Sequence, residues 1–379
     1  MGYNILIVDD VLFNRTILRE ALKGMEEVTF TDAENGMQAL DIIAGQEISL
    51  IILDLMMPLK DGFEVLHDMK QEKDFKDIPV IVYSAIDDID SISKALTLGA
   101  YDYFTKPLKP KEMNVILPMK VKNALISYDQ QKTIRTLNEK MKLELLMANL
   151  FQQSMLKEKQ DMSSATMYGK YIPSQEIGGD FYESFQIGED TWFIMADVSG
   201  YGVSAAMLSS MLKVEFHHCA QFIQSPEKVL KWMNQTFYKI TQSNYSLTAF
   251  VGKIHENTLF YSNAGQPYPM VFRVKDKTVQ ILRESNFPLG MEDNEAYNLH
   301  NIELESDDII MTYTDGLLED RSFKDSLGVY DDLANNFITY QQIIKENPSD
   351  FFDIIFKLFG NVQNEEVNHD MAIMLICMK

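Results

Sequence analysis

The first third of the chain alternates short apolar runs with amphipathic stretches. Three of the apolar runs are unbroken, which is typical of parallel strands covered on both faces. The stretches between them, such as Asn14–Leu22 and Gly36–Ala44, carry apolar residues at helical spacing. This alternation predicts a doubly wound α/β domain over residues 1–122. Its expected strands are Ile5–Val8, Val28–Thr31, Leu50–Leu53, Val80–Tyr83 and Tyr103–Thr105.

Residues 123–165 have a different pattern, without glycine or proline and rich in Lys, Glu, Gln, Leu and Met. Apolar residues recur there at three-four spacing, which predicts a long helical linker with an apolar seam. One helix cannot bury such a seam alone, so we expect a parallel, coiled-coil-like homodimer. The alternative is that the seam packs against the chain's own domains. The linker seam consists of Ile134, Leu137, Met141, Leu145, Ala148, Phe151 (or Gln152) and Met155.

Residues 166–379 are rich in strand patterns with hairpin turns between them. This predicts an α+β domain with two antiparallel sheets flanked by helices. The expected strands are Phe181–Gln186, Trp192–Asp197, Thr248–Ile254, Thr258–Asn263, Met270–Val274, Ile309–Thr314 and Ala372–Cys377. The expected helices are Ser204–Ala220 and Pro226–Thr241.

Charge and composition narrow the possible partners. The chain has 379 residues and a formal net charge of −22, which disfavours nucleic acid and anionic membrane surfaces. No apolar run approaches the roughly 18 residues of a membrane-spanning helix, and no signal peptide pattern begins the chain. The two cysteines have no disulfide or zinc-site spacing. These features predict a cytoplasmic protein.

Polar residues follow four of the first domain's strands. Asp9 and Asp10 follow the first, Asp54 follows the third, Ser84 ends the fourth and Lys106 follows the fifth. Carboxyl ends of adjacent parallel strands face one crevice, so these groups should meet there. Converging carboxylates repel one another unless a hard cation such as Mg²⁺ lies between them. A carboxylate, Mg²⁺, a hydroxyl and a lysine together suit phosphoryl transfer to the carboxylate.

These motifs resemble the receiver domain of two-component response regulators. The resemblance implies a flavodoxin-like, five-stranded parallel sheet and a phosphoryl group accepted by Asp54 from a histidine kinase or a phosphotransfer protein. It also implies the remaining roles: Mg²⁺ bound by Asp9, Asp10, Asp54 and the Met56 carbonyl, phosphoryl contacts from Ser84 and Lys106, and Tyr103 as the aromatic residue that moves with Ser84. The motifs are Asp9-Asp10, Asp54-Leu55-Met56-Met57-Pro58 with Gly62, Ser84-Ala85 and Lys106-Pro107.

A second acidic site is predicted across a hairpin. A type II′ turn at Gly188-Glu189 would pair Phe181 with Ala196 and set Asp180 opposite Asp197. Like charges opposite each other destabilise a sheet, and a divalent cation would relieve that repulsion. Asp315 follows one later strand and Asp370 precedes another. Such an oxygen-rich cluster suits two Mg²⁺ or Mn²⁺ ions that activate water.

The second domain is similar to the metal-dependent protein phosphatase superfamily (PPM, protein phosphatase 2C-like), in the bacterial branch of sporulation and stress-response phosphatases. The resemblance implies that Asp180, Asp197, Asp315 and the Val198 carbonyl bind metal. The motifs are Gly178-Gly179-Asp180-Phe181-Tyr182, Ala196-Asp197-Val198-Ser199-Gly200, Thr248-Ala249, Asn263-Ala264-Gly265, Pro288-Leu289-Gly290 and Tyr313-Thr314-Asp315-Gly316.

The final motif departs from the family. The usual Asp-Asp-x-Thr appears as His369-Asp370-Met371-Ala372, so an imidazole replaces a carboxylate. Imidazole suits Mn²⁺ better than Mg²⁺. Either Asp370 substitutes as ligand, or metal affinity falls, or catalysis is lost. The family often has Asp at position 183, Lys at 201 and His at 266, where this chain has Glu183, Tyr201 and Gln266.

The combined expectation is a response regulator in which Asp54 phosphorylation controls a protein serine/threonine phosphatase. By resemblance, the substrate would be a phosphorylated anti-sigma-factor antagonist in a partner-switching pathway. The alternative is a phosphatase fold without catalysis that serves as a phosphorylation-controlled adaptor.

Overall fold

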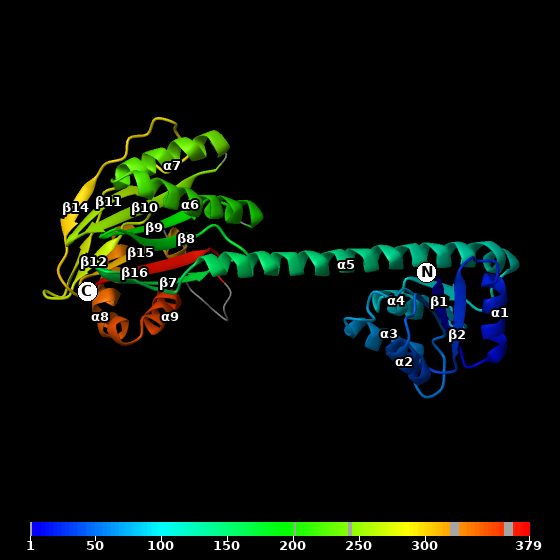
Figure 1. Ribbon diagram of the computed structural model, residues 1–379. Coiled ribbons are helices and arrows are strands. Elements are labelled where there is room, and N and C mark those ends of the chain that lie inside the picture. The colour runs from blue at the N-terminus through cyan, green and yellow to red at the C-terminus, as the bar shows by residue number, and fades with distance from the viewer. Residues whose placement is uncertain (1, 201, 242–244, 319–325, 360–366) are drawn as a thin grey trace. The chain divides into compact units, whose positions relative to one another are not determined.

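A computed structural model describes the chain except for residues 1, 201, 242–244, 319–325 and 360–366. The chain forms two compact units, Met1–Lys142 and Leu143–Lys379 (Figure 1). In the part of the chain that is described, no helix is long and apolar enough to cross a membrane. Both cysteine thiols are free, with Cys219 buried and Cys377 half-buried.

The first unit is built on a parallel sheet of five strands in the order β2-β1-β3-β4-β5. This is the flavodoxin-like order, so the predicted α/β fold is confirmed. The strands are β1 Tyr3–Val8, β2 Val28–Ala33, β3 Leu50–Leu53, β4 Val80–Ser84 and β5 Asp102–Thr105. The helices between them are α1 Leu12–Leu22, α2 Gly36–Gly45, α3 Gly62–Gln71 and α4 Ile89–Thr97. Strands β3 and β4 are buried along their whole length, which explains their unbroken apolar sequence.

Helix α5, Leu117–Met155, follows a π-helical turn at Glu112–Ile116 and contains most of the predicted linker. It ends ten residues before the expected end. The intervening residues enter β6 Lys159–Asp161, which pairs with β7 Ala165–Ile172. Pairing with a neighbouring strand overrides the helix-compatible composition of residues 156–165. The seam residues Ile134, Leu137 and Met141 are each more than half exposed.

The second unit stacks two antiparallel sheets between two pairs of helices, which confirms the predicted α+β fold (Figure 1). One sheet has the order β14-β11-β10-β9-β8 and the other β13-β12-β15-β16-β7-β6. Helices α6 Val203–Phe222 and α7 Pro226–Thr241 pack on the first sheet. Helices α8 Ser326–Glu346 and α9 Pro348–Phe359 pack on the second. The remaining strands are β8 Phe181–Ile187, β9 Asp190–Val198, β10 Leu247–His255, β11 Thr258–Ala264, β12 Met270–Arg273, β13 Thr278–Ile281, β14 His300–Glu303, β15 Ile309–Tyr313 and β16 Met371–Met378.

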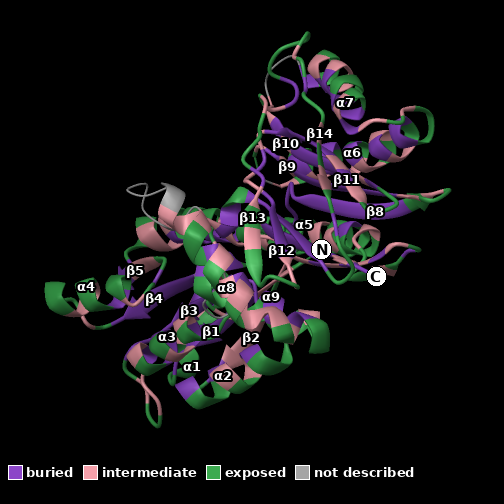
Figure 2. Ribbon diagram, turned by 90° about the vertical axis from the view of Figure 1, so that its left-hand side faces the viewer, coloured by how far each residue is buried: buried purple, intermediate pink, exposed green. Residues whose placement is uncertain are grey.

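The burial pattern reflects this layering, because the central strands β9, β15 and β16 are almost entirely buried while the helices bury one side (Figure 2). Besides the apolar residues under the two helix pairs, a core cluster fills the space between the two sheets. It includes Tyr182 from β8 and Phe250 from β10. The Tyr182 ring lies against Gly169 of β7, where any side chain would collide with it. The seven strands expected in this unit are present, whereas β6, β7, β13, β14, α8 and α9 were not predicted.

Helix α2 of the first unit begins and ends with glycine, and the two positions differ in their surroundings. A Cβ on Gly36 would lie 2.5 Å from Val65 Cγ2 and 2.7 Å from the Lys60 carbonyl oxygen. A Cβ on Gly45 would meet nothing within 4 Å. The backbone N–H of Gly36 donates to the Lys60 carbonyl at 3.3 Å, so this close approach ties α2 to the loop that follows β3.

We therefore predict opposite effects of the same substitution at the two ends of α2. Gly36→Ala should lower the free energy of unfolding of the first unit by about 1–3 kcal/mol, because the new methyl group collides with backbone. Gly45→Ala should be neutral or stabilising by about 0.4–1 kcal/mol, because it restricts only the unfolded chain. Urea unfolding followed by circular dichroism measures both. Equal stability of the two variants would contradict the packing described here.

Candidate functional sites

The predicted acidic crevice of the first unit is present at the carboxyl ends of β1 and β3. Asp9 and Asp54 are buried, with 1% and 6% of their surfaces exposed, and Asp10 is exposed. One carboxylate oxygen from each of these three residues lies within 4.8 Å of the other two. This spacing and the all-oxygen donor set fit a divalent cation such as Mg²⁺.

Lys106 links the two buried carboxylates. Its Nζ lies 2.7 Å from Asp9 Oδ2 and 2.5 Å from Asp54 Oδ2. Burial alone would lower the pKa of Lys106, but hydrogen bonds and charge from Asp54 and Asp9 outweigh it and raise the pKa. The ammonium group therefore stays charged and partly neutralises the crevice.

Of the other residues predicted for the crevice, Met56 and Gly62 contact Asp54 directly. The Met56 backbone N–H donates to Asp54 Oδ1 at 3.2 Å. The side chain of Ser84 is fully buried, and Tyr103 donates its hydroxyl to the Ile86 carbonyl at 2.7 Å. A Cβ on Gly62 would lie 2.3 Å from the carbonyl oxygen of Asp54, so only glycine fits beside this strand end.

In the second unit the hairpin has the predicted register, with Phe181 paired with Ala196 and Ile187 with Asp190. Gly188 has a φ of +61°, as the first central position of a type II′ turn requires. Asp180 directly precedes β8, and Asp197 lies at the facing end of β9. The structure thus brings together the two carboxylates that the sequence set opposite each other.

A cavity of about 240 Å³ collects all six residues predicted for the second site. They line it together with two hydroxyl residues of β10 and the loop before it and with two residues that follow β9. The lining residues are Asp180, Asp197, Val198, Ser199, Gly200, Ser246, Thr248, Asp315, His369 and Asp370. No lysine or arginine lines the cavity among the described residues.

Crowding of carboxylates perturbs the acidity of this cavity. Burial, followed by the charges of Asp197 and Asp370, raises the pKa of Asp180 well above its usual value. Burial and the charge of Asp315 raise the pKa of Asp197 to about 7. Asp180 and Asp315 both lie within hydrogen-bonding reach of Asp197, so the acids form two pairs that share this residue. Carboxylate oxygens gathered in one cavity are the type of ligand that hard divalent cations prefer.

Thr314 fixes one member of the cluster. Its hydroxyl donates to Asp180 Oδ2 at 2.6 Å and accepts the Ala372 backbone N–H at 2.8 Å. Thr314 directly follows β15 and Ala372 lies near the start of β16, whereas Asp180 precedes β8 of the other sheet. These hydrogen bonds therefore join both sheets at the site.

The carboxylate of Asp370 is held by four donors. Oδ1 accepts the backbone N–H and the hydroxyl of Ser174, at 2.7 and 2.8 Å. Oδ2 accepts the Gly179 N–H at 2.7 Å and the Tyr171 hydroxyl at 3.4 Å. A Cβ on Gly178 would lie 1.9 Å from this oxygen. Asp370 therefore anchors the glycine pair that precedes Asp180.

Of the milder departures from the family pattern, Tyr201 lies outside the described residues, and the other two have separate surroundings. Glu183 is buried away from the cavity lining, where it pairs with Lys213 Nζ at 3.1 Å and His217 Nε2 at 2.9 Å on α6. Gln266 is buried beside β9. In the amide orientation that satisfies both of its ends, its oxygen accepts the Asp197 N–H at 3.1 Å and the Thr248 hydroxyl at 2.9 Å.

Several contacts of the site had no signal in the sequence. Ser174 and Tyr171 lie in β7 and the loop after it, and they reach Asp370 across a sequence separation of almost 200 residues. Thr314 belongs to the motif Tyr313-Thr314-Asp315-Gly316. Its hydrogen bond to Asp180 could not be predicted, because it depends on the contact between the sheets.

Sequence comparisons match both units to known families. The family described as Stage II sporulation protein E (SpoIIE) matches residues 188–379, just over half of the chain. The family described as response regulator receiver domain matches residues 5–117.

Individual relatives cover one unit at a time. The phosphoserine phosphatase RsbU of Bacillus subtilis (strain 168) is 26% identical over 200 residues, covering 52% of this chain and 60% of RsbU. The probable transcriptional regulator ycf27 of Cyanophora paradoxa is 40% identical over 111 residues, covering 29% of this chain and 44% of ycf27. The chain thus spans less than two thirds of the length of these relatives.

Among solved structures, the SiaA-PP2C domain of Pseudomonas aeruginosa superimposes with a TM-score of 0.52 at 17% identity. The match covers 64% of this chain and 98% of that domain, and it supports the layered fold of the second unit. On the family match over residues 188–379, the chain belongs to the SpoIIE family, and a response regulator receiver domain precedes its phosphatase-like unit.

Proposed function

We propose that the protein is a phosphorylation-controlled, metal-dependent phosphatase that removes phosphate from serine or threonine residues of another protein. The observation that carries the proposal is a pair of carboxylate clusters, one in each unit. Asp9, Asp10 and Asp54 form the first. The second lines the cavity of the phosphatase-like unit and contains Asp180, Asp197 and Asp315.

In the receiver unit, Asp54 is proposed to accept the phosphoryl group from a histidine kinase or a phosphotransfer protein. Its Oδ2 atom already faces a cation, the ammonium group of Lys106 at 2.5 Å. Lys106 would hold one oxygen of the bound phosphoryl group, and Ser84 would contact another. Tyr103 is proposed to change position with Ser84. Bound Mg²⁺ would neutralise part of the added charge of about −1.5 to −2.

In the phosphatase unit, Asp180, Asp197 and Asp315 are proposed to hold two divalent cations, with the Val198 carbonyl as a further ligand. The raised pKa values of Asp180 and Asp197 support this role, because buried carboxylates that repel one another gain most from a shared cation. The bound ions would supply an activated water and a clamp for the phosphoryl group. Thr314 keeps Asp180 oriented towards the cavity.

The proposed substrate is a phosphorylated anti-sigma-factor antagonist in a partner-switching pathway. The similarity to RsbU, a phosphoserine phosphatase, supports this class of substrate. Dephosphorylation of such a protein, assayed with and without phosphorylation of Asp54, tests the proposal directly.

A second candidate is a phosphorylation-controlled adaptor that binds the substrate protein without turnover. The observation that favours it is the final motif. His369 stands where the family has a carboxylate. Both carboxylate oxygens of Asp370 already accept hydrogen bonds, from Ser174 and from Gly179. Asp370 would therefore have to exchange these hydrogen bonds for a metal ion if it replaced the missing ligand.

We predict that Asp54 is the single site of phosphorylation. Incubation with acetyl phosphate and Mg²⁺ should add the mass of one phosphoryl group to the wild type and none to Asp54→Asn. Asp41→Asn, which alters an exposed carboxylate of α2, should be labelled like the wild type. Intact-protein mass spectrometry measures all three, and labelling of Asp54→Asn at the wild-type level would refute the assignment.

We predict measurable phosphatase activity with Mn²⁺ and weak activity with Mg²⁺. The imidazole of His369 tolerates the softer Mn²⁺ better and adds no negative charge. His369→Asp should raise the ratio of Mg²⁺ to Mn²⁺ activity by about tenfold, which corresponds to about 1.4 kcal/mol. His369→Asn, which adds an oxygen without charge, should raise it less.

Asp197→Ala should abolish turnover with either metal, because Asp197 is shared by both carboxylate pairs. Hydrolysis of p-nitrophenyl phosphate under matched metal concentrations measures these variants. An unchanged metal preference in His369→Asp would contradict the assigned role of His369. Absence of turnover in the wild type with any divalent ion, even after Asp54 phosphorylation, would leave the adaptor as the function.

We also predict that the exposed linker seam forms a parallel homodimer whose association changes with the phosphorylation of Asp54. Leu137→Glu should weaken the dimer because it places a charge in the seam, whereas Asn138→Glu at the adjacent exposed position should not. Multi-angle light scattering gives the masses. A monomeric mass for the wild type in both phosphorylation states would refute the dimer.

A further inference from the structure

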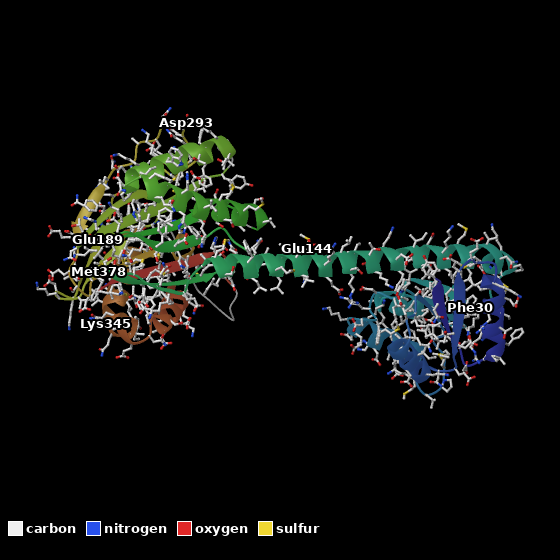
Figure 3. The ribbon with its side chains drawn as sticks, in the orientation of Figure 1. Phe30, Glu144, Glu189, Asp293, Lys345 and Met378 are labelled. Carbon is white, nitrogen blue, oxygen red and sulfur yellow. The ribbon has the colours of Figure 1, made fainter. Side chains whose placement is uncertain are left out.

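The last two turns of α5 contain an isolated buried polar residue. All of α5 is described, and beyond Leu125 every residue of the helix is exposed or half-buried except Gln152, of which 5% is exposed. Figure 3 marks Glu144 in the exposed stretch that precedes these turns. The neighbouring Phe151 is 66% exposed. Seam spacing fits either Phe151 or Gln152 at this turn. The helix buries the amide of Gln152 and leaves the aromatic ring of Phe151 exposed.

The amide of Gln152 pairs with the backbone of one glycine. Its Nε2 donates to the Gly178 carbonyl at 2.7 Å, and its Oε1 accepts the Gly178 N–H at 3.4 Å. Nε2 also lies 3.4 Å from the Ser209 hydroxyl of α6. Because both ends of the amide are engaged, the contact fixes the rotation of the helix about its axis as well as its distance from Gly178.

Two further contacts hold the same end of α5. Lys213 of α6 donates to the Met155 carbonyl at 2.7 Å and pairs with Glu183 at 3.1 Å. Asn149 donates to the Glu176 carbonyl, one turn earlier on the helix. Asn149 and Gln152 are three residues apart, so their side chains share the face of α5 that meets the segment before β8.

Gly178 connects this contact to the candidate metal ligands. It lies two residues before Asp180, and its Cα has no room for a side chain beside Asp370 Oδ2. The next residue, Gly179, donates its N–H to the same carboxylate oxygen. Gly178 and Gly179 both contact the Asp370 carboxylate. A movement of Gly178 must therefore shift these contacts or the backbone that leads to Asp180.

We infer that Gln152 is a positioning residue that couples the rotation of α5 to the geometry of Asp180. This inference rests on the proposed control of the phosphatase by Asp54 phosphorylation, and it assigns that control to one hydrogen-bonded pair. A rotation of α5 by one residue, about 100°, would remove the amide from Gly178. The N–H and the carbonyl of the buried Gly178 would then both lose their hydrogen bonds to Gln152. Because unpaired buried polar groups are costly, the segment Gly178–Asp180 must change its position.

The test compares the full-length wild type, Gln152→Ala and Gln153→Ala. Gln153 is the matched control, because it is the same residue type, next in the helix and exposed. The readout is the ratio of p-nitrophenyl phosphate turnover with and without acetyl phosphate, at saturating Mn²⁺. The ratio should fall to within about twofold of one in Gln152→Ala and stay at the wild-type value in Gln153→Ala. A wild-type ratio of one would instead defeat the proposed regulation itself.

Hydrogen–deuterium exchange of the peptide covering residues 174–182 keeps the test decisive if Gln152→Ala is inactive. In the wild type and Gln153→Ala, exchange of this peptide should change on Asp54 phosphorylation. In Gln152→Ala it should be the same in both states. Gln152→Asn, whose shorter side chain keeps the amide, should recover part of the response. A phosphorylation response in Gln152→Ala equal to that of the wild type, by either readout, would overturn the inference.

Discussion

Mutual repulsion of buried carboxylates shapes both functional regions of this protein. In each unit, acidic side chains at the ends of strands lie close together and partly shielded from bulk water. Like charges interact strongly in such surroundings. In the receiver unit Lys106 bridges Asp9 and Asp54 and offsets part of the repulsion. In the phosphatase unit the cavity has no such lysine among its described residues, and burial together with the charges of neighbouring carboxylates raises the pKa values of Asp180 and Asp197. The remaining features of each region serve to hold these groups in place.

Backbone packed close to the carboxylates provides much of that support. Gly62 allows the β3–α3 loop to touch the Asp54 carbonyl, and Gly178 leaves room for the Asp370 carboxylate. Gly316 is similar, since a Cβ there would lie 2.1 Å from the Asp370 carbonyl oxygen. A side chain at any of these positions would separate the segments that bring the acids together. These three glycines are therefore steric requirements of the two sites.

The sequence predicted those parts of the structure that depend on local pattern. The unbroken apolar strands gave the receiver fold, and the Gly188-Glu189 turn fixed the register that sets Asp180 opposite Asp197. Strand β7 was missed because Gly169 interrupts its alternating pattern, although packing against Tyr182 requires that glycine. The donors to Asp370 could not be predicted, since Ser174 meets it only through the pairing of β7 with β16. Seam spacing could not distinguish Phe151 from Gln152, because both fit the same turn of the helix.

The different charge balance of the two regions explains why control would act on the second. Lys106 gives the receiver crevice a built-in cation, so its carboxylates are partly compensated before any ligand arrives. In the proposed function the phosphatase cavity would take the same compensation from bound cations, which would require Asp180, Asp197 and Asp315 to hold their ligand atoms at fixed separations. On this proposal, a small displacement of the backbone before Asp180 would change the affinity for metal more than it would change the stability of the fold. Gly178, hydrogen-bonded to the end of α5 and packed on Asp370, is the point of the chain where such a displacement can enter.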